Sequence, residues 1–167
     1  MNTPSHWETS LESLARTEQV GNRIGSLLPT DAICLFTGDL AAGKTTLIKA
    51  ICGGMGVDPR TVISPTYTMT NIYQGEQAIY HVDLYRIEEA EAFSMMDVDD
   101  WINPEGVTLI EWPQIAAEIL ADLPTLALTL ERQGSPDQPV HHLKVESQDA
   151  VYAPLIKDLS TLKEARP

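Results

Sequence analysis

Residues 38–45 have the composition and spacing of a phosphate-binding loop. They read Gly-Asp-Leu-Ala-Ala-Gly-Lys-Thr, which fits the pattern G-x-x-x-x-G-K-[ST]. The two glycines allow such a loop to wrap so that successive backbone N–H groups point at phosphate oxygens. Lys44 would then reach the β- and γ-phosphates of a nucleotide, and the hydroxyl of Thr45 would ligate Mg²⁺. The pattern therefore predicts a site for a nucleotide and Mg²⁺.

The segments on either side of this loop are those that a phosphate site requires. Residues 32–36 are a short apolar run typical of a buried strand, and residues 46–52 are typical of a helix. The first turn of that helix would add unpaired N–H groups and the positive end of its dipole. We expect the nucleotide to contact the loop, the residue after it and one aromatic residue further along the chain: Gly38, Asp39, Leu40, Ala41, Ala42, Gly43, Lys44, Thr45, Thr46 and Trp112.

Two carboxylates stand where strands are expected to end, and both could serve the Mg²⁺ ion. Glu111 closes the apolar run 107–110, and Asp83 closes the run 79–82. The acidic partner of a phosphate loop normally lies at the carboxyl end of a neighbouring strand. Each residue could bind the metal directly, bind it through water or orient the attacking water. A strand-end carboxylate exposed to solvent is the alternative for both.

Other residues near these carboxylates are candidates for less direct roles. Thr66, in the segment 64–66, lies where phosphate-loop proteins sense the γ-phosphate, although it also suits a plain strand position. His81 is more typical of a satisfied structural histidine. Arg86 could pair with a phosphate or form a surface ion pair. Trp112 could pack on the nucleotide, at an interface or in the core.

Strand and helix signals alternate along the chain. Residues 9–12 have the form of a capping box and open an amphipathic helix that ends at Pro29. Residues 66–84 predict an antiparallel hairpin, and residues 134–137 predict a turn. The remaining predicted elements are helices at 88–96 and 114–123 and strands at 106–112, 126–130 and 142–145. Together they predict an α/β, three-layer fold of the phosphate-loop NTPase kind, with a mostly parallel central sheet plus an antiparallel hairpin.

Length and composition favour one domain. The chain has 167 residues, of which 43% are hydrophobic, enough for a single core. We expect the domain to cover residues 1–167, with residues 1–8 disordered and residues 134–167 forming a C-terminal strand and helix. Cys34 and Cys52 are expected to be packed thiols. The sequence has no long apolar run and no signal-peptide pattern, so we expect a cytoplasmic protein without membrane contact.

The charge is strongly negative and unevenly distributed. The chain has 11 Lys and Arg against 24 Asp and Glu, for a net charge of −13, which opposes unaided binding to nucleic acid. Residues 87–131 contain no Lys or Arg. Their acidic residues form either a solvated face or a docking surface for a basic partner: Glu88, Glu89, Glu91, Asp97, Asp99, Asp100, Glu105, Glu111, Glu118, Asp122 and Glu131.

Two classes of phosphate-loop protein fit the sequence poorly. Proteins that bind guanine normally carry an N/T-K-x-D segment for the base and a D-x-x-G segment for the γ-phosphate, and this sequence has neither. A small-molecule kinase usually needs a lid with several arginines, and residues 87–131 have none. We therefore expect an adenine-type ATPase or a nucleotide-dependent binding switch with negligible hydrolysis, and we keep a small-metabolite kinase as a third alternative.

Four motifs, in this order and spacing, resemble a known family. They are GDLAAGKTT at 38–46, SPTY at 64–67, HVDLYR at 81–86 and LIEWP at 109–113. They look like the bacterial ATPase of tRNA threonylcarbamoyladenosine (t6A) biosynthesis, the TsaE type, over roughly residues 10–132. The first motif alone is shared by many unrelated ATPases, whereas the four together are specific.

The resemblance implies a small ATPase that uses ATP or ADP and Mg²⁺. It would dock on a threonylcarbamoyl-transfer protein of sugar-kinase fold and its paralogue, and it would contact tRNA at most indirectly. It further implies that Thr66 senses the nucleotide and that Asp83, Glu111 and Trp112 lie at the catalytic centre. The sequence departs from the family at Ala41, where glycine is usual. If the backbone there needs a positive φ, alanine costs about 1 kcal/mol.

Overall fold

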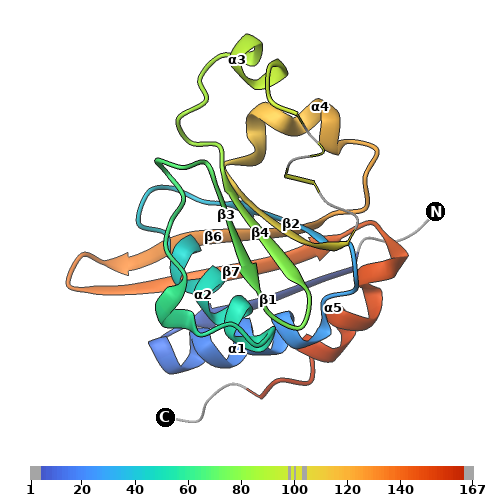
Figure 1. Cartoon of the computed structure of the whole chain (residues 1–167). Helices are drawn as coiled ribbons and strands as arrows, with labels where there is room; N and C mark the ends of the chain where they lie inside the picture. Colours follow the sequence, from blue (N-terminus) through green and yellow to red (C-terminus); the bar gives the residue numbers. More distant parts are fainter. Residues whose placement is uncertain (1–4, 98, 100, 103–104, 164–167) are drawn as a thin grey trace.

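A seven-stranded sheet forms the middle layer of the protein (Figure 1), with strands in the order β1-β7-β6-β2-β5-β4-β3. The computed structural model describes residues 5–97, 99, 101–102 and 105–163. The strands are β1 Ser5–Leu11, β2 Ile33–Thr37, β3 Thr70–Gln74, β4 Ala78–Asp83, β5 Gly106–Glu111, β6 Leu126–Ser135 and β7 Gln138–Ser147.

The four central strands run parallel. β2 pairs in parallel with β5 and β6, and β4 pairs in parallel with β5. Antiparallel strands flank this centre: β3 on one side, and β7 followed by β1 on the other. The predicted α/β fold with a parallel centre and an antiparallel hairpin is therefore confirmed. Because parallel strands end at the same edge, β2, β4 and β5 bring their C-terminal residues together.

Helices cover both faces of the sheet. The longer ones lie on one face (Figure 1) and are α1 Leu14–Leu27, α2 Lys44–Gly54 and α5 Ala153–Leu159. The short α3 Ala90–Ser94 and α4 Ala117–Leu120 lie on the other. The 3₁₀ turns η1 Pro59–Thr61, η3 Pro113–Ala116 and η4 Ala150–Tyr152 lie between these elements. No helix in the described ranges is both long and apolar enough to span a bilayer.

Each face of the sheet has its own apolar core, and alternation along the strands assigns side chains to them. Ile79 and Leu109 belong to the core beneath α1 and α2, whereas Val82 and Ile110 belong to the core beneath α3 and α4. Side chains two residues apart point to the same face. Asp83 lies four residues after Ile79, and Glu111 lies two residues after Leu109. Both are therefore expected on the α2 face.

The N-terminal segment differs from the prediction. Residues 5–8 are part of β1, so the predicted disorder is wrong for them; residues 1–4 lie outside the described residues. The capping box at 9–12 is also wrong, because α1 begins at Leu14 with Ser13 as its N-cap. β1 forms because an antiparallel partner, β7, pairs with it from Ser5 to Leu11 and buries the side chain of Leu11.

Two hairpins differ in extent from the prediction. β6 and β7 are longer than predicted and meet across the predicted turn, where Ser135 pairs with Gln138. The other hairpin begins later, because β3 starts at Thr70. Residues 66–69 form a turn instead, closed by a hydrogen bond from the Met69 N–H to the Pro65 carbonyl (2.6 Å). Cys34 and Cys52 are free and buried, as expected.

Candidate functional site

The phosphate-type loop connects β2 to α2, and its two glycines adopt conformations that favour glycine. Gly38 has φ 149° and Gly43 has φ 99°. A Cβ on Gly38 would lie 2.5 Å from the carbonyl oxygen of Leu130, which is too close for any side chain. Lys44 opens α2, so the unpaired N–H groups of its first turn face the loop. The predicted strand, loop and helix are thus in the order that an anion site needs.

Lys44 lies across the inside of this loop. Its side chain is buried, and Nζ donates hydrogen bonds to the carbonyls of Gly38 and Asp39, the second at 2.9 Å. Nζ also lies 4.2 Å from the centre of the Trp112 ring, a cation–π contact. Burial lowers the pKa of Lys44, and the charges of Glu111, Asp83 and Asp39 oppose this effect. Lys44 is therefore a buried cation directed at the loop.

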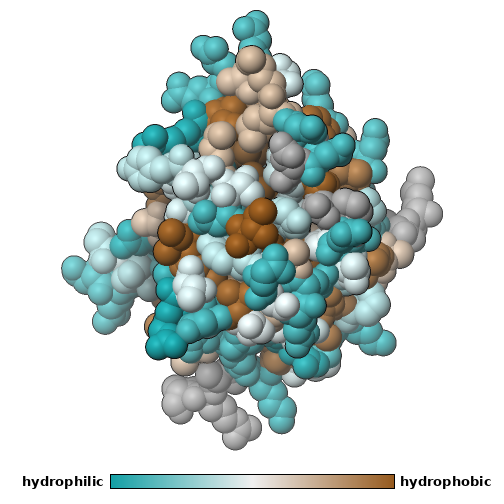
Figure 2. All heavy atoms as spheres, viewed as in Figure 1, coloured by the Kyte–Doolittle hydropathy of each residue, from teal (hydrophilic) through white to brown (hydrophobic). Residues whose placement is uncertain are grey.

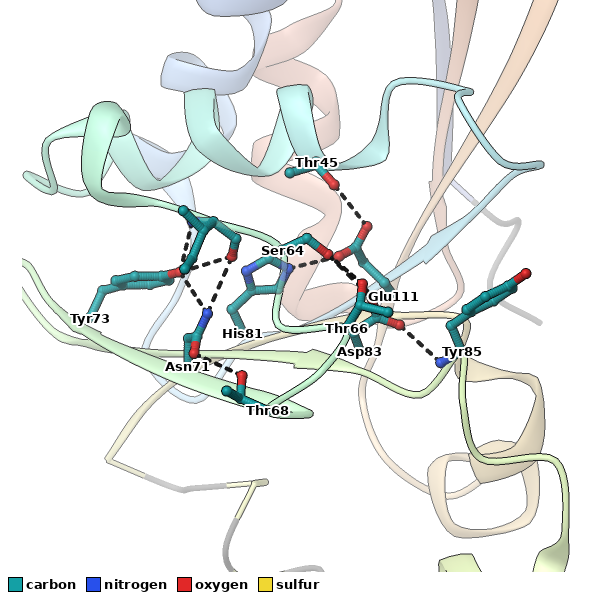
Figure 3. A network of polar contacts seen from close by, with 11 residues as sticks. Thr45, Ser64, Thr66, Thr68, Asn71, Tyr73, His81, Asp83, Tyr85 and Glu111 are labelled. Atoms are coloured by element: carbon teal, nitrogen blue, oxygen red, sulfur yellow. Dashed lines mark hydrogen bonds and ion pairs between the residues drawn. The ribbon is translucent and has the colours of Figure 1, made fainter.

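Asp83 and Glu111 lie side by side at the ends of neighbouring strands. They are register partners on β4 and β5 and are 4% and 3% exposed, respectively. Thr45 of α2 donates a long hydrogen bond of 3.4 Å to Oε1 of Glu111, as Figure 3 shows. The two predicted carboxylates are therefore brought to the loop, and neither is an exposed strand-end group. A hydroxyl and carboxylates are hard oxygen ligands of the kind that Mg²⁺ prefers.

Thr66 reaches the carboxylate of Asp83 from the segment between α2 and β3. Its hydroxyl donates to Oδ2 of Asp83 at 2.9 Å and also contacts the hydroxyl of Ser64 at 2.8 Å (Figure 3). The other Asp83 oxygen, Oδ1, accepts the Tyr85 N–H at 2.9 Å. Thr66 is thus a turn residue bound to Asp83, and the alternative of a plain strand position is wrong.

Side chains of strand β3 form hydrogen bonds with the start of the segment 63–69. The Tyr73 hydroxyl accepts the N–H of Ile63 at 3.2 Å, and the Asn71 amide donates to the Ile63 carbonyl at 3.3 Å (Figure 3). The turn that follows places Met69 at φ 63°, a conformation rare for residues other than glycine. Its carbonyl accepts the N–H of Asp83 at 2.9 Å. Residues 63–69 are therefore attached to the hairpin at both ends.

Trp112 has a strained backbone beside the loop. Its φ is 56° and ψ is 56°, the left-handed region, which bulky residues rarely adopt. Its ring contacts that of Tyr85, with centroids 5.0 Å apart. Both residues line the same cavity as the loop and the two carboxylates. Of the three alternatives for Trp112, this placement favours the nucleotide side. Arg86 instead stacks its guanidinium over Tyr67, 4.1 Å from the ring centre.

These residues surround a cavity of about 400 Å³. It is lined by loop residues, by Ser64 and Thr66, and by Asp83, Tyr85, Glu111 and Trp112. The cavity fits a phosphate chain with Mg²⁺, because its lining combines Lys44 and the first turn of α2 with oxygen ligands. Gly38 and Asp39 do not line it; their carbonyls hold Lys44.

His141 is a cavity residue that the sequence did not reveal. It comes from β7, and its Nδ1 donates to the carbonyl of Ala42 at 2.7 Å. A Cβ on Gly43 would lie 3.5 Å from the same ring, an ordinary van der Waals distance, so the histidine packs directly against the loop. His141 also lines a second cavity of about 270 Å³ together with Gly43 and Thr46. No motif surrounds it; only the pairing of β7 with β1 and β6 places it there.

Ala41 meets the condition under which alanine is unfavourable, because its φ is 63°. We predict that Ala41→Gly leaves the free energy of unfolding nearly unchanged. Glycine relieves about 1 kcal/mol of backbone strain in the folded state, and this offsets the higher conformational entropy that it gives the unfolded chain. Ala42→Gly is the matched control: it adjoins Ala41, is buried and has no positive φ. It should destabilise by at least about 1 kcal/mol more in urea unfolding. Equal losses in the two variants would contradict the assigned strain.

Comparison with known proteins identifies the family. The family model described as "Threonylcarbamoyl adenosine biosynthesis protein TsaE" matches residues 11–140. A tRNA threonylcarbamoyladenosine biosynthesis protein TsaE from Synechocystis is 37% identical over 111 residues, covering 64% of this chain and 70% of its own. The protein of the same name from Bacillus subtilis is 33% identical over 133 residues, 79% of each chain.

A solved structure has the same fold. The crystal structure of YdiB from Bacillus subtilis superposes with a TM-score of 0.78 at 24% identity, covering 96% of this chain and 97% of that one. The superposition shows the fold, whereas the family assignment depends on the sequence matches. The family model and the similar sequences confirm the motif resemblance: this chain belongs to the TsaE family of threonylcarbamoyl adenosine biosynthesis proteins.

Proposed function

We propose that this protein binds and hydrolyses Mg²⁺-ATP in support of the protein complex that installs threonylcarbamoyl on the adenosine next to the tRNA anticodon. The observation that carries the proposal is one cavity where the phosphate loop meets a hydroxyl and two buried carboxylates. Family membership supplies the pathway. We place the protein in the cytoplasm, in keeping with its free, buried cysteines.

The residues would divide the work as follows. The loop backbone and Lys44 bind and orient the phosphate chain, and Thr45 with Glu111 holds Mg²⁺. When bound, Mg²⁺ neutralises charge that develops on the transferred phosphoryl group. Glu111 is the better direct ligand of the two carboxylates, because its Oε1 faces the Thr45 hydroxyl. Asp83 instead accepts a hydrogen bond from the Thr66 hydroxyl and so holds Thr66 in place. Through Thr66, the γ-phosphate can act on the segment 63–69.

The second cavity is the place that we propose for the nucleobase. It adjoins the loop at Gly43 and Thr46, and its lining includes the apolar side chains of Leu11, Leu14 and Leu130. A flat, mostly apolar base suits such a surface, with few polar groups to fix its orientation. Adenine is preferred in this proposal because the sequence has no guanine-reading segment. Calorimetric titration should therefore show tighter binding of ATP than of GTP.

A partner is expected to stimulate hydrolysis. We predict a low rate for the protein alone and a higher rate with the threonylcarbamoyl-transfer protein and its paralogue. The described acidic residues of α3 and its flanks are exposed, and hydrophilic side chains surround α3 in Figure 2. Such a one-signed surface would speed association with a basic partner, with a salt dependence set by a Debye length of about 8–10 Å. A small apolar patch lies below it in Figure 2, over β3 and β4, where Ile72 is 55% exposed.

Charge reversal tests this surface. The variant Glu88→Lys, Glu89→Lys, Glu91→Lys should slow association several-fold without changing nucleotide affinity. Asp97 and Asp99 can be added to the set, whereas Asp100 lies outside the described residues. Glu18→Lys is the control, because Glu18 is exposed on α1, across the sheet from α3. Association that ignores salt and all these reversals would leave the acidic stretch as a solvated face.

Phosphate release from ATP, measured with and without the partner proteins, tests the proposed function. Release that rises with partner supports an ATPase, and stoichiometric binding without release would favour the binding switch. Transfer of phosphate to a small acceptor in a metabolite screen would favour a kinase instead.

A further inference from the structure

His81 is a fully buried histidine next to the proposed metal ligand. It lies on β4 and is 0% exposed. Its Nε2 contacts Oε2 of Glu111 at 2.9 Å, while the other Glu111 oxygen, Oε1, faces Thr45 (Figure 3). The ring of Tyr73 is its aromatic neighbour, with centroids 6.4 Å apart. His81 therefore occupies one side of the Glu111 carboxylate and leaves the other side to the site.

The hydrogen bonding determines which ring nitrogen carries the proton. An ionised carboxylate only accepts hydrogen bonds, so Nε2 of His81 must donate. Nδ1 is buried and has no hydrogen-bond partner among the described residues. A proton on Nδ1 would create a buried N–H without an acceptor, which proteins rarely tolerate. The Nε2–H tautomer therefore fits the ring in its present place, because it leaves an unpaired lone pair on Nδ1 and no unpaired N–H.

The strand pattern explains why this histidine can reach the site. His81 and Asp83 are two residues apart on β4, so both side chains point to the α2 face of the sheet. In the parallel register, Asp83 is opposite Glu111 and His81 is opposite Leu109. On β4, Asp83 therefore lies directly beside Glu111, and His81 lies two residues before Asp83. A donor at that position fixes the rotation of the carboxylate.

We propose that His81 is a positioning residue that holds Oε2 of Glu111 so that Oε1 is presented toward Thr45 and the metal. The inference rests on the proposed function, because it assigns Glu111 to Mg²⁺. It goes beyond it by giving the histidine of the 81–86 motif a defined task in place of core packing. Loss of such a partner typically costs about 10- to 100-fold in metal affinity or activity.

Two substitutions separate positioning from packing. His81→Gln keeps a side-chain N–H that can reach the place of Nε2, whereas His81→Leu removes the donor and keeps an apolar filling. Each variant is titrated with ADP by calorimetry, with Mg²⁺ and with a chelator. We expect His81→Leu to lose about 10-fold or more of the Mg²⁺-dependent gain in affinity, with chelated ADP binding unchanged, and His81→Gln to recover much of the loss.

A stability control accompanies them. Ile79→Ala destabilises the same strand from the same face, two residues earlier, at a fully buried site. It should lower the melting temperature and keep the Mg²⁺-dependent gain. If His81→Leu keeps the gain as well, or if His81→Gln loses as much as His81→Leu, the positioning role is overturned.

The tautomer gives a readout that is independent of nucleotide. In a ¹H–¹⁵N correlation of the histidine rings, His81 should be protonated at Nε2 and not at Nδ1, and the signal should change in Glu111→Gln. Protonation at Nδ1 would overturn the inference even if ATP hydrolysis is found. A wild-type protein that binds ADP without any effect of Mg²⁺ would overturn the proposed metal role itself, while the hydrogen bond could still be observed.

Discussion

Replacing Lys44 with alanine is expected to weaken nucleotide binding on the order of 10²-fold or more and to remove hydrolysis. Lys44 is the buried cation of the loop, and its Nζ already lies among the carbonyls of Gly38 and Asp39, within reach of the phosphate cavity. Charge-assisted hydrogen bonds to phosphate contribute about 1.5–3 kcal/mol each, and the transferred phosphoryl group adds to this demand. Calorimetry and phosphate release measure the two effects.

Lys49→Ala is the matched control for this variant. Lys49 lies on the same helix, carries the same charge and is not among the residues of the cavity. It should bind ATP as the wild type does. Thermal unfolding of both variants excludes a folding defect. Unimpaired binding by Lys44→Ala would show that the loop assignment is wrong.

Glu111→Gln is expected to reduce hydrolysis on the order of 10²-fold or more, with a smaller effect on nucleotide binding. Glutamine keeps the shape of the side chain and an oxygen that can accept from His81, but it removes the charge that faces Thr45. The lost interaction is strongest when charge develops in the transition state, so the rate falls more than the affinity. Asp83→Asn should act in the same direction, because Asp83 holds Thr66.

The comparison is made in the presence of the partner proteins, where the wild-type rate is highest. Glu118→Gln, an exposed glutamate on α4, is the control for loss of one negative charge. It should hydrolyse ATP at the wild-type rate. Parent rates for both Glu111→Gln and Asp83→Asn would contradict their assignment to the metal and water side of the site.

The parts of the site that the sequence predicted are those carried by short local patterns. The loop 38–45 follows from its glycine spacing, and Asp83 and Glu111 follow from apolar runs that end in an acid. Parallel strands then place both carboxylates at one edge of the sheet, next to the loop. The positive φ of Ala41 could be named only as a possibility, because the residue type alone does not determine the backbone angle.

The parts that the sequence did not predict depend on contacts between distant segments. β1 exists because β7, more than a hundred residues later, pairs with it, and local capping patterns at 9–12 favoured a helix instead. His141 reaches the loop through the same pairing. The role of His81 was hidden for another reason: its partner, Glu111, lies on a neighbouring strand thirty residues away. Tertiary pairing outweighed local propensity at β1, and it brought each of the two histidines to a distant partner.

We propose the cavity between the loop and the two carboxylates as a site for Mg²⁺ and an adenine nucleotide. The decisive measurement is titration of the wild-type protein with ATP in the presence of Mg²⁺, with GTP and a chelator as comparisons. We expect one ATP per chain, weaker binding of GTP, and a loss of affinity when Mg²⁺ is removed. Equal affinity for ATP and GTP, or binding that does not depend on Mg²⁺, would contradict it.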